Sequence, residues 1–176
     1  MPSFEFEGKR PRVHPEAWVA PTAVLIGDVE VGAGASIWFG VVIRADESSI
    51  TIGPGTNVQD NVVIHCSRNL PTVIGANVTV GHLACMEACV VEDGAVVGIG
   101  AVMLQRTRLG ERAMLAAGSV LPEGQEVPAG HLAAGSPAQV KKELSGSSAS
   151  WVDRTARHYQ RAGQAYRAGL VGVDRA

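Results

Sequence analysis

The sequence is poor in the features that mark several large classes of protein. Aromatic residues make up only 5% of its 176 residues, although apolar residues reach 46%. No run approaches the roughly 18 uninterrupted apolar residues of a membrane-spanning helix, and Glu5 and Glu7 stand where a secretory signal would be apolar. The net charge is −2 without a basic cluster, so we expect neither nucleic acid nor a membrane as a partner.

The cysteines do not form a pattern typical of disulfides or of metal clusters. There are three, Cys66, Cys85 and Cys89, and no two of them form a CxxC pair. An odd number without such a pair is typical of a reducing compartment, so we expect a cytoplasmic protein. We expect Cys85 and Cys89 to pack as small apolar residues, and Cys66 to turn inward, away from its neighbour His65.

What the sequence does contain is a period of six. Large aliphatic residues recur at this spacing, with small residues four positions after many of them, and glycine is frequent at 21 copies. A helix would repeat at three and four and an ordinary strand at two, so a period of six predicts hexapeptide β-helix repeats. The large residues are Val19, Leu25, Val31, Ile37, Ile43, Ile52, Val58, Ile64, Ile74, Val80 and Met86, and after a slip of one residue Val91, Val97, Met103, Leu109, Leu115 and Leu121.

The predicted fold class is all-β: a left-handed parallel β-helix with three hexapeptides to each coil and between five and six coils. A β-sandwich is the main competitor, and the strict register argues against it. The repeat decays after Pro128. Residues 1–145 are therefore predicted to form the β-helix, and residues 146–176 a polar linker at 147–150 followed by an amphipathic helix that packs on it.

The register also predicts which polar side chains are neighbours. Residues three repeats apart lie one above the other on one face, about 4.8 Å apart. This puts Arg44, His65 and Glu87 in one column, while Gln59 and His82 share the next face. His82 cannot easily meet His65 and Glu87 within one chain, but it could meet those of a neighbour. The spacing therefore predicts a site shared between β-helices that pack side by side.

The chain resembles the γ-class carbonic anhydrase-like family over residues 10–144, in the segments IGDVEVGAGASIWFGVVIRAD, TNVQDNVVIH, VTVGH and LAAGSPAQV. The resemblance implies a homotrimer in which His65 and His82 bind a metal ion, usually zinc, across the subunit interface. It also implies that Arg44 and Asp46 help to hold the subunits together.

Two further residues take their expected roles from this resemblance. An Asn-x-Gln motif of the family corresponds here to Asn57 and Gln59, which the resemblance implies are catalytic residues. The resemblance implies that Gln59 orients metal-bound water or bicarbonate. Gln59 could equally be a turn amide without a part in the reaction.

The chain departs from the family at the third metal ligand. Where the family pattern has a histidine five residues after the histidine of the VGH segment, this chain has Glu87. Two histidines and a carboxylate form a set that zinc accepts in hydrolytic enzymes, and that iron(II) and manganese also accept. Glu87 therefore either completes a metal site with His65 and His82 or marks a site that has weakened.

The predicted function is the reversible hydration of CO2 to bicarbonate by a metal-bound hydroxide, a carbonate dehydratase type of lyase activity weakened by Glu87. One alternative is an acyltransferase or thioesterase acting on coenzyme A esters, because such enzymes also use hexapeptide β-helices. Another is a trimeric scaffold without catalysis, in which the metal site has decayed.

Overall fold

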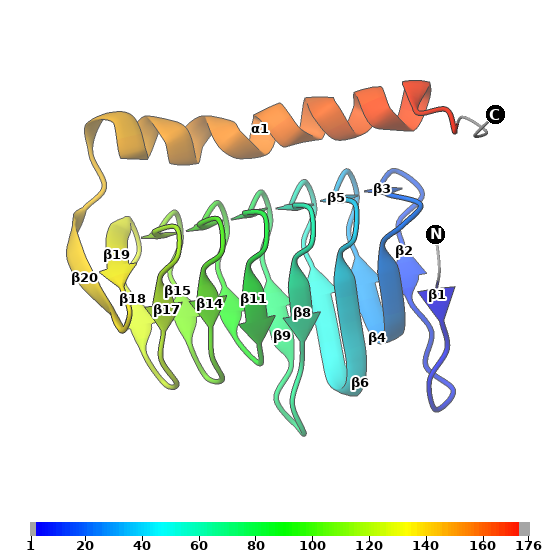
Figure 1. Cartoon of the computed structure of the whole chain (residues 1–176), viewed down its shortest axis with the longest axis horizontal. Coiled ribbons are helices and arrows are strands. Elements are labelled where there is room, and N and C mark those ends of the chain that lie inside the picture. The colour runs from blue at the N-terminus through cyan, green and yellow to red at the C-terminus, as the bar shows by residue number, and fades with distance from the viewer. Residues whose placement is uncertain (1–2, 173–176) are drawn as a thin grey trace.

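The hexapeptide repeats form short parallel strands that stack into the three faces of a β-helix, with one long α-helix beside it (Figure 1). The structure is a computed structural model, and it describes residues 3–172. Residues 173–176, the end of the predicted C-terminal segment, lie outside this range. The predicted fold class, a left-handed β-helix with a C-terminal helix, is confirmed.

Faces one and two belong to a single sheet, because two long strands, β4 (Val24–Val31) and β6 (Val42–Ile52), bend from the first face into the second. Face one consists of the first halves of these strands with β1 (Ser3–Phe4), β8 (Val63–His65), β11 (Cys85–Glu87), β14 (Val102–Met103) and β17 (Val120–Leu121). Face two consists of their second halves with β2 (Arg12–Val13), β9 (Thr72–Ile74), β12 (Val90–Val91), β15 (Arg108–Leu109) and β18 (Glu126–Val127).

Face three is a separate sheet with seven parallel strands, so the β-helix has about seven coils. These strands are β3 (Trp18–Val19), β5 (Ser36–Ile37), β7 (Asn57–Val58), β10 (Thr79–Val80), β13 (Val96–Val97), β16 (Met114–Leu115) and β19 (His131–Gly135), followed by the antiparallel β20 (Ala138–Glu143). The expected five to six coils were too few. Strands continue at both ends where the repeat is weak, through Val13, Val127 and Ala133.

The six-residue register gives the packing of the core as predicted. Ile43, Ile64, Met86 and Met103 lie directly above one another in neighbouring strands of face one, and none of them is exposed. Small residues such as Ala101 are also fully buried at the corners. Stacking identical positions brings aliphatic side chains into contact in every coil, which is the main source of stability in such a repeat.

The helix α1 (Gly146–Gly169) runs along the length of the β-helix (Figure 1). It begins at Gly146, so residues 147–150 are helical, and the prediction that they form a linker was wrong. Aromatic side chains fill the space between α1 and the coils, with ring centroids 4.8 to 6.0 Å apart: Trp18, Trp38, Phe39, Tyr159 and Tyr166. The few aromatic residues thus attach the helix instead of filling the narrow coil interior.

Candidate metal centre

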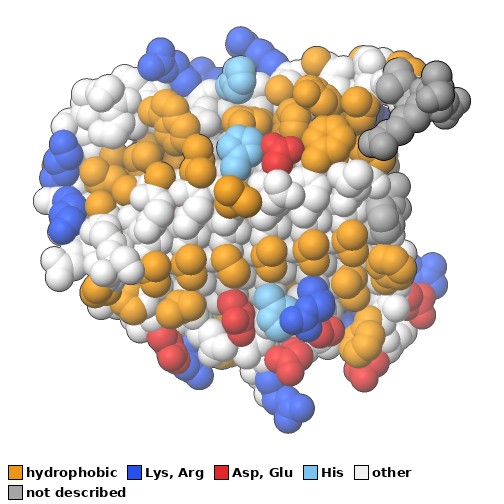
Figure 2. Space-filling model, in the orientation of Figure 1, with side chains coloured by type: hydrophobic (Ala, Val, Ile, Leu, Met, Phe, Trp, Pro, Cys, Tyr) orange, Lys and Arg blue, Asp and Glu red, His pale blue; other side chains and the backbone are white. Residues whose placement is uncertain are grey.

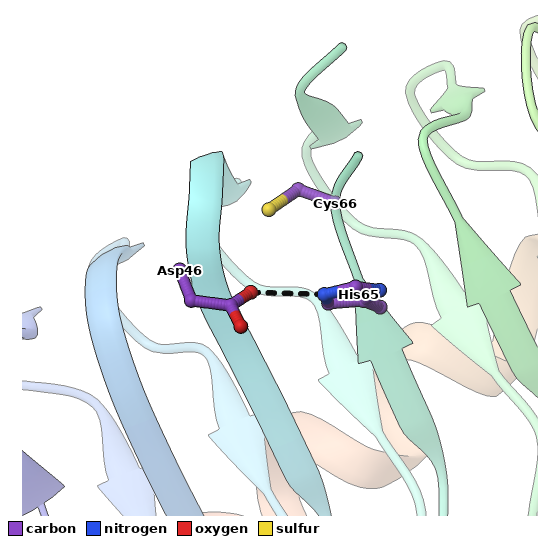
Figure 3. Close-up of side chains that lie close together, drawn as sticks. All are labelled: Asp46, His65 and Cys66. Atoms are coloured by element: carbon purple, nitrogen blue, oxygen red, sulfur yellow. Dashed lines mark hydrogen bonds and ion pairs between the residues drawn. The ribbon is translucent and has the colours of Figure 1, made fainter. Parts of the chain in front are cut away.

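The first part of the candidate site lies where the strands of face one end. Arg44 is paired with His65 and His65 with Glu87 in successive coils, as the register predicted. Asp46 also lies here, with its Oδ1 atom 2.9 Å from Nε2 of His65, and Figure 3 shows the two side chains pointing toward one another. Arg44 donates a hydrogen bond to the other oxygen of Asp46. We call this group of residues the His65 edge.

The electrostatics of the His65 edge favour an ionised Asp46. Burial acts to raise the pKa of this carboxyl group, but hydrogen bonds from His65 and Arg44 outweigh burial and lower the pKa below its ordinary value. Asp46 can therefore accept a hydrogen bond from Nε2–H of His65 at neutral pH. In this tautomer Nδ1 of the ring carries a lone pair that is free to bind a metal ion. The expected role of Arg44 and Asp46 in holding subunits together stays a prediction.

Glu87 faces the other nitrogen of the same imidazole. Its Oε1 atom lies 4.0 Å from Nδ1 of His65, which is too long for a hydrogen bond. The same oxygen accepts a hydrogen bond of 2.9 Å from Nε2 of Gln105, a residue of the following coil. Glu87 therefore lies beside His65 without bonding to it, and its side chain is 38% exposed.

The cysteines divide between the core and the surface. Cys66 turns inward and is fully buried, as expected, but its Sγ still lies within 4.8 Å of ligand atoms of Asp46 and His65 (Figure 3). Cys89 is buried too, and burial, with a smaller effect of Cys85, raises its pKa to about 12. Cys85 is exposed on face one, so the expectation that it packs as a core residue was wrong.

The second part of the candidate site lies at the corner where the chain enters face one. Nδ1 of His82 is 2.9 Å from an oxygen of Asp60, and Nε2 is 3.3 Å from the hydroxyl group of Tyr159 on α1. Burial, and to a smaller extent the charge of Asp60, raises the pKa of Tyr159, so its hydroxyl group keeps its proton at neutral pH. We call this group the His82 edge.

Asn57 and Gln59 lie beneath the His82 edge and are buried. Gln59 accepts a hydrogen bond of 3.2 Å from the backbone N–H of His82 and donates one of 3.0 Å to Asn57. Asn57 in turn donates to the hydroxyl group of Thr79 at 2.9 Å. The two amides thus fix the backbone at His82. The expected role of Gln59 in orienting metal-bound water or bicarbonate, and that of Asn57 as a catalytic residue, stay predictions.

Sequence reasoning missed two residues of the His82 edge. Asp60 directly follows Gln59 in the sequence, so its position at the same corner could have been read from the register. Tyr159 could not have been found in this way, because α1 lies outside the six-residue repeat. The sequence predicts only that this helix packs on the β-helix.

The two edges are the opposite borders of face one. His65 is the last residue of β8, whereas His82 precedes the first residue of β11. Figure 2 shows a horizontal row of hydrophobic side chains across this face, with histidine side chains above and below it. The register gives its members as Val24, Val42, Val63, Cys85, Val102 and Val120. Among residues 3–172, the potential metal-binding cluster of His65 does not include His82.

Comparison with known proteins identifies the family, although no protein-family model matches the chain. It is 41% identical over 157 residues to γ carbonic anhydrase 2 of Arabidopsis thaliana mitochondria, covering 86% of this chain. It is also 38% identical to a carbonic anhydrase of Geobacillus kaustophilus, covering 94% of this chain and 91% of that protein. The chain belongs to the γ-carbonic anhydrase-like family.

This γ-carbonic anhydrase-like protein also has sequence relatives and structural neighbours with other names. The carnitine operon protein CaiE of Salmonella agona is 36% identical, with 97% of this chain and 86% of CaiE covered. A crystal structure of a hexapeptide transferase family protein from Anaplasma phagocytophilum is 38% identical, with a TM-score of 0.90 over 94% of this chain and 98% of that one. The chain spans only 56% of the length of the Arabidopsis relative.

Proposed function

We propose that this protein is a homotrimeric metalloenzyme that reversibly hydrates CO2 to bicarbonate, at a site formed by His65 and Glu87 of one subunit and His82 of the next. The main support for the proposal is that an aspartate contacts a ring nitrogen of each histidine. Each histidine has an aspartate oxygen 2.9 Å from one of its ring nitrogens, in a hydrogen bond at His65 and in an ion-pair contact at His82. Histidines that bind metals almost always donate their other ring N–H to a carboxylate, a backbone carbonyl or a water, which fixes the ring and the tautomer.

The donor atoms fit a divalent metal ion. Asp46 leaves Nδ1 of His65 free, and the 4.0 Å between this atom and the Glu87 carboxylate means that neither group satisfies the other. Two imidazoles and one carboxylate form a set used by zinc, iron(II) and manganese. We propose zinc as the native metal, with iron and manganese as the alternatives.

The positions of the two histidines support the proposed trimer. They occupy opposite borders of one face, so a three-fold rotation that turns this face inward brings the His65 edge of one subunit to the His82 edge of the next. The row between the edges includes Val63, which is 43% exposed, and such apolar surface is typical of subunit interfaces. Arg44 and Asp46 would lie at the same junction.

When bound, a divalent metal supplies the acidity that turns water into a nucleophile near neutral pH. The chain's own residues then hold the donors in place: Asp46 and Asp60 orient the imidazoles, while Gln59 fixes the backbone of His82. Glu87 adds a negative charge where the family pattern has a neutral imidazole, so it reduces this acidity. We therefore propose weak hydration of CO2 at neutral pH that increases as the pH rises.

The likeness to the hexapeptide transferase family protein supports a second candidate, a transferase, for which we propose acyl transfer from coenzyme A esters. The two functions differ in what the protein must bind. Metal analysis of protein purified without chelators, a CO2-hydration assay and an acetyl coenzyme A binding measurement distinguish them. We expect close to one metal ion per chain and hydration activity; binding of acetyl coenzyme A by metal-free protein would favour the transferase.

The helix and the cysteines bear on where the protein is located. No helix among residues 3–172 combines the length and the apolar character needed to cross a membrane. All three cysteines are free, as is usual in a reducing compartment, and this supports our proposal of a cytoplasmic location.

A further inference from the structure

The carboxylate of Glu87 is held by a residue that comes from the next coil. β14 pairs with β11 in parallel register, so the turn after β14 lies beside the turn after β11. Gln105 occupies this turn, and its Nε2 atom donates a hydrogen bond of 2.9 Å to Oε1 of Glu87. The contact therefore joins two successive coils at the His65 edge.

The backbone of this turn is itself fixed on both sides. The N–H of Arg106 donates to the carbonyl oxygen of Ala88 at 2.8 Å, and the N–H of Gly124 donates to the carbonyl oxygen of Gln105 at 3.0 Å. Gln105 thus reaches Glu87 from a backbone tied to the coils before and after it. A side chain on such a backbone can hold its partner in a defined position.

The bonded oxygen of Glu87 is also the one that lies 4.0 Å from Nδ1 of His65. A glutamate has three side-chain torsions, and one that is 38% exposed would turn freely into solvent without a partner. The hydrogen bond from Gln105 keeps the carboxylate on the His65 side. Asp46 does the equivalent for the imidazole from the preceding coil.

We propose that Gln105 is a positioning residue for Glu87, one that holds the carboxylate where it can act as a metal ligand with His65. The inference rests on the proposed metal site, and it adds to that site a residue that would not touch the metal or the substrate. Residues in this relation to a metal ligand change metal affinity when they are replaced, typically by about 10 to 100-fold.

The zinc affinity of the purified 176-residue chain tests the proposal, measured by calorimetric titration with zinc chloride up to millimolar concentration. Four proteins form a cycle: the wild type, Gln105→Leu, Glu87→Ala and the double variant. Leucine keeps most of the volume of glutamine but cannot donate a hydrogen bond. Gln125→Leu is the matched control, because Gln125 is an exposed amide in the following coil, and no side-chain hydrogen bond of Gln125 is seen among residues 3–172.

We expect Gln105→Leu to weaken zinc binding by about tenfold or more, with an unchanged melting temperature of the metal-free protein, and Gln125→Leu to bind as the wild type does. In the Glu87→Ala background the same change should have no further effect. Wild-type affinity in Gln105→Leu would overturn the inference, and so would an equal loss in both backgrounds. A wild type that binds no zinc would instead overturn the metal site itself, and the role of Gln105 with it.

Discussion

The two edges of face one are alike in that an aspartate contacts one ring nitrogen of the histidine. They differ in the residue that faces the other ring nitrogen. At both edges an aspartate oxygen is 2.9 Å from one ring nitrogen. The other nitrogen of His65 faces Glu87, which belongs to the β-helix itself, whereas that of His82 faces the hydroxyl group of Tyr159 on α1. One edge is thus built from the repeat alone, and the other also needs a helix outside it.

The two edges therefore have different roles in the proposed site. The His65 edge brings a carboxylate and an imidazole together within one subunit, so we expect it to bind a metal weakly even without His82. The His82 edge brings a single imidazole, whose free nitrogen is covered by a phenol until something displaces it. Substitutions at each edge separate the two contributions.

The largest expected effect is that of His82→Ala. Removing one of three ligands should lower metal affinity by at least about 100-fold, so protein purified without chelators should carry no metal. The fold should persist, because this side chain is partly exposed at a corner. Elemental analysis measures the loss. His131→Ala is the control, since His131 bonds to the backbone of Ala129; full metal content in His82→Ala would show that His82 is not a ligand.

Glu87→His is expected to have the next largest effect, in the opposite direction. A neutral imidazole would leave more of the metal's charge uncompensated and lower the pKa of bound water. A shift of about one unit corresponds to about tenfold faster CO2 hydration near pH 7. Stopped-flow assays across pH would show the gain. If the variant binds zinc fully through three histidines and gains no activity at any pH, the charge argument is wrong.

Asp46→Asn tests the contact between Asp46 and His65 through its effect on the free energy of unfolding. The folded-state pKa of Asp46 is lowered, so its stabilising effect is complete above the unfolded pKa of about 3.9 and is lost as the pH falls through the folded value. We expect a loss of about 1 kcal/mol in the free energy of unfolding at pH 7. Urea denaturation should show the wild type and the variant converging below about pH 4. A difference that stays constant from pH 7 to pH 3 would contradict the role of the ionised carboxylate.

Tyr159→Phe should have the smallest effect. It removes the hydroxyl group that lies 3.3 Å from Nε2 of His82 and keeps the ring that packs on Trp38. Because the hydroxyl group and the metal compete for the same nitrogen, zinc affinity should stay equal or rise, by no more than about threefold. Zinc titration measures it. A strong loss of affinity would mean that the hydroxyl group supports the bound state.

The sequence predicted the parts of this site that obey the repeat. The six-residue register predicted the column of Arg44, His65 and Glu87, because stacked coils place equivalent positions of the repeat above one another. The coils at the two ends were missed, since Val13, Val127 and Ala133 continue the register where the pattern is faint.

Contacts outside the repeat could not be predicted in this way. Tyr159 reaches His82 across 77 residues of sequence, and its position depends on how α1 packs through its aromatic side chains. The exposure of Cys85 was missed for a related reason. Strand alternation alone makes it an outward residue, but its apolar character had favoured the core.

The claim that one site is shared between two subunits is tested most directly by mixing two inactive variants. His65→Ala and His82→Ala should each be metal-free as homotrimers. If they are unfolded together in equal amounts and refolded, every mixed trimer has one junction with both histidines intact, so random assembly should restore about a quarter of the wild-type zinc content. Recovery near that level is the predicted result. A refolded mixture of trimers that binds no more zinc than either variant alone would show that the two histidines do not meet between subunits.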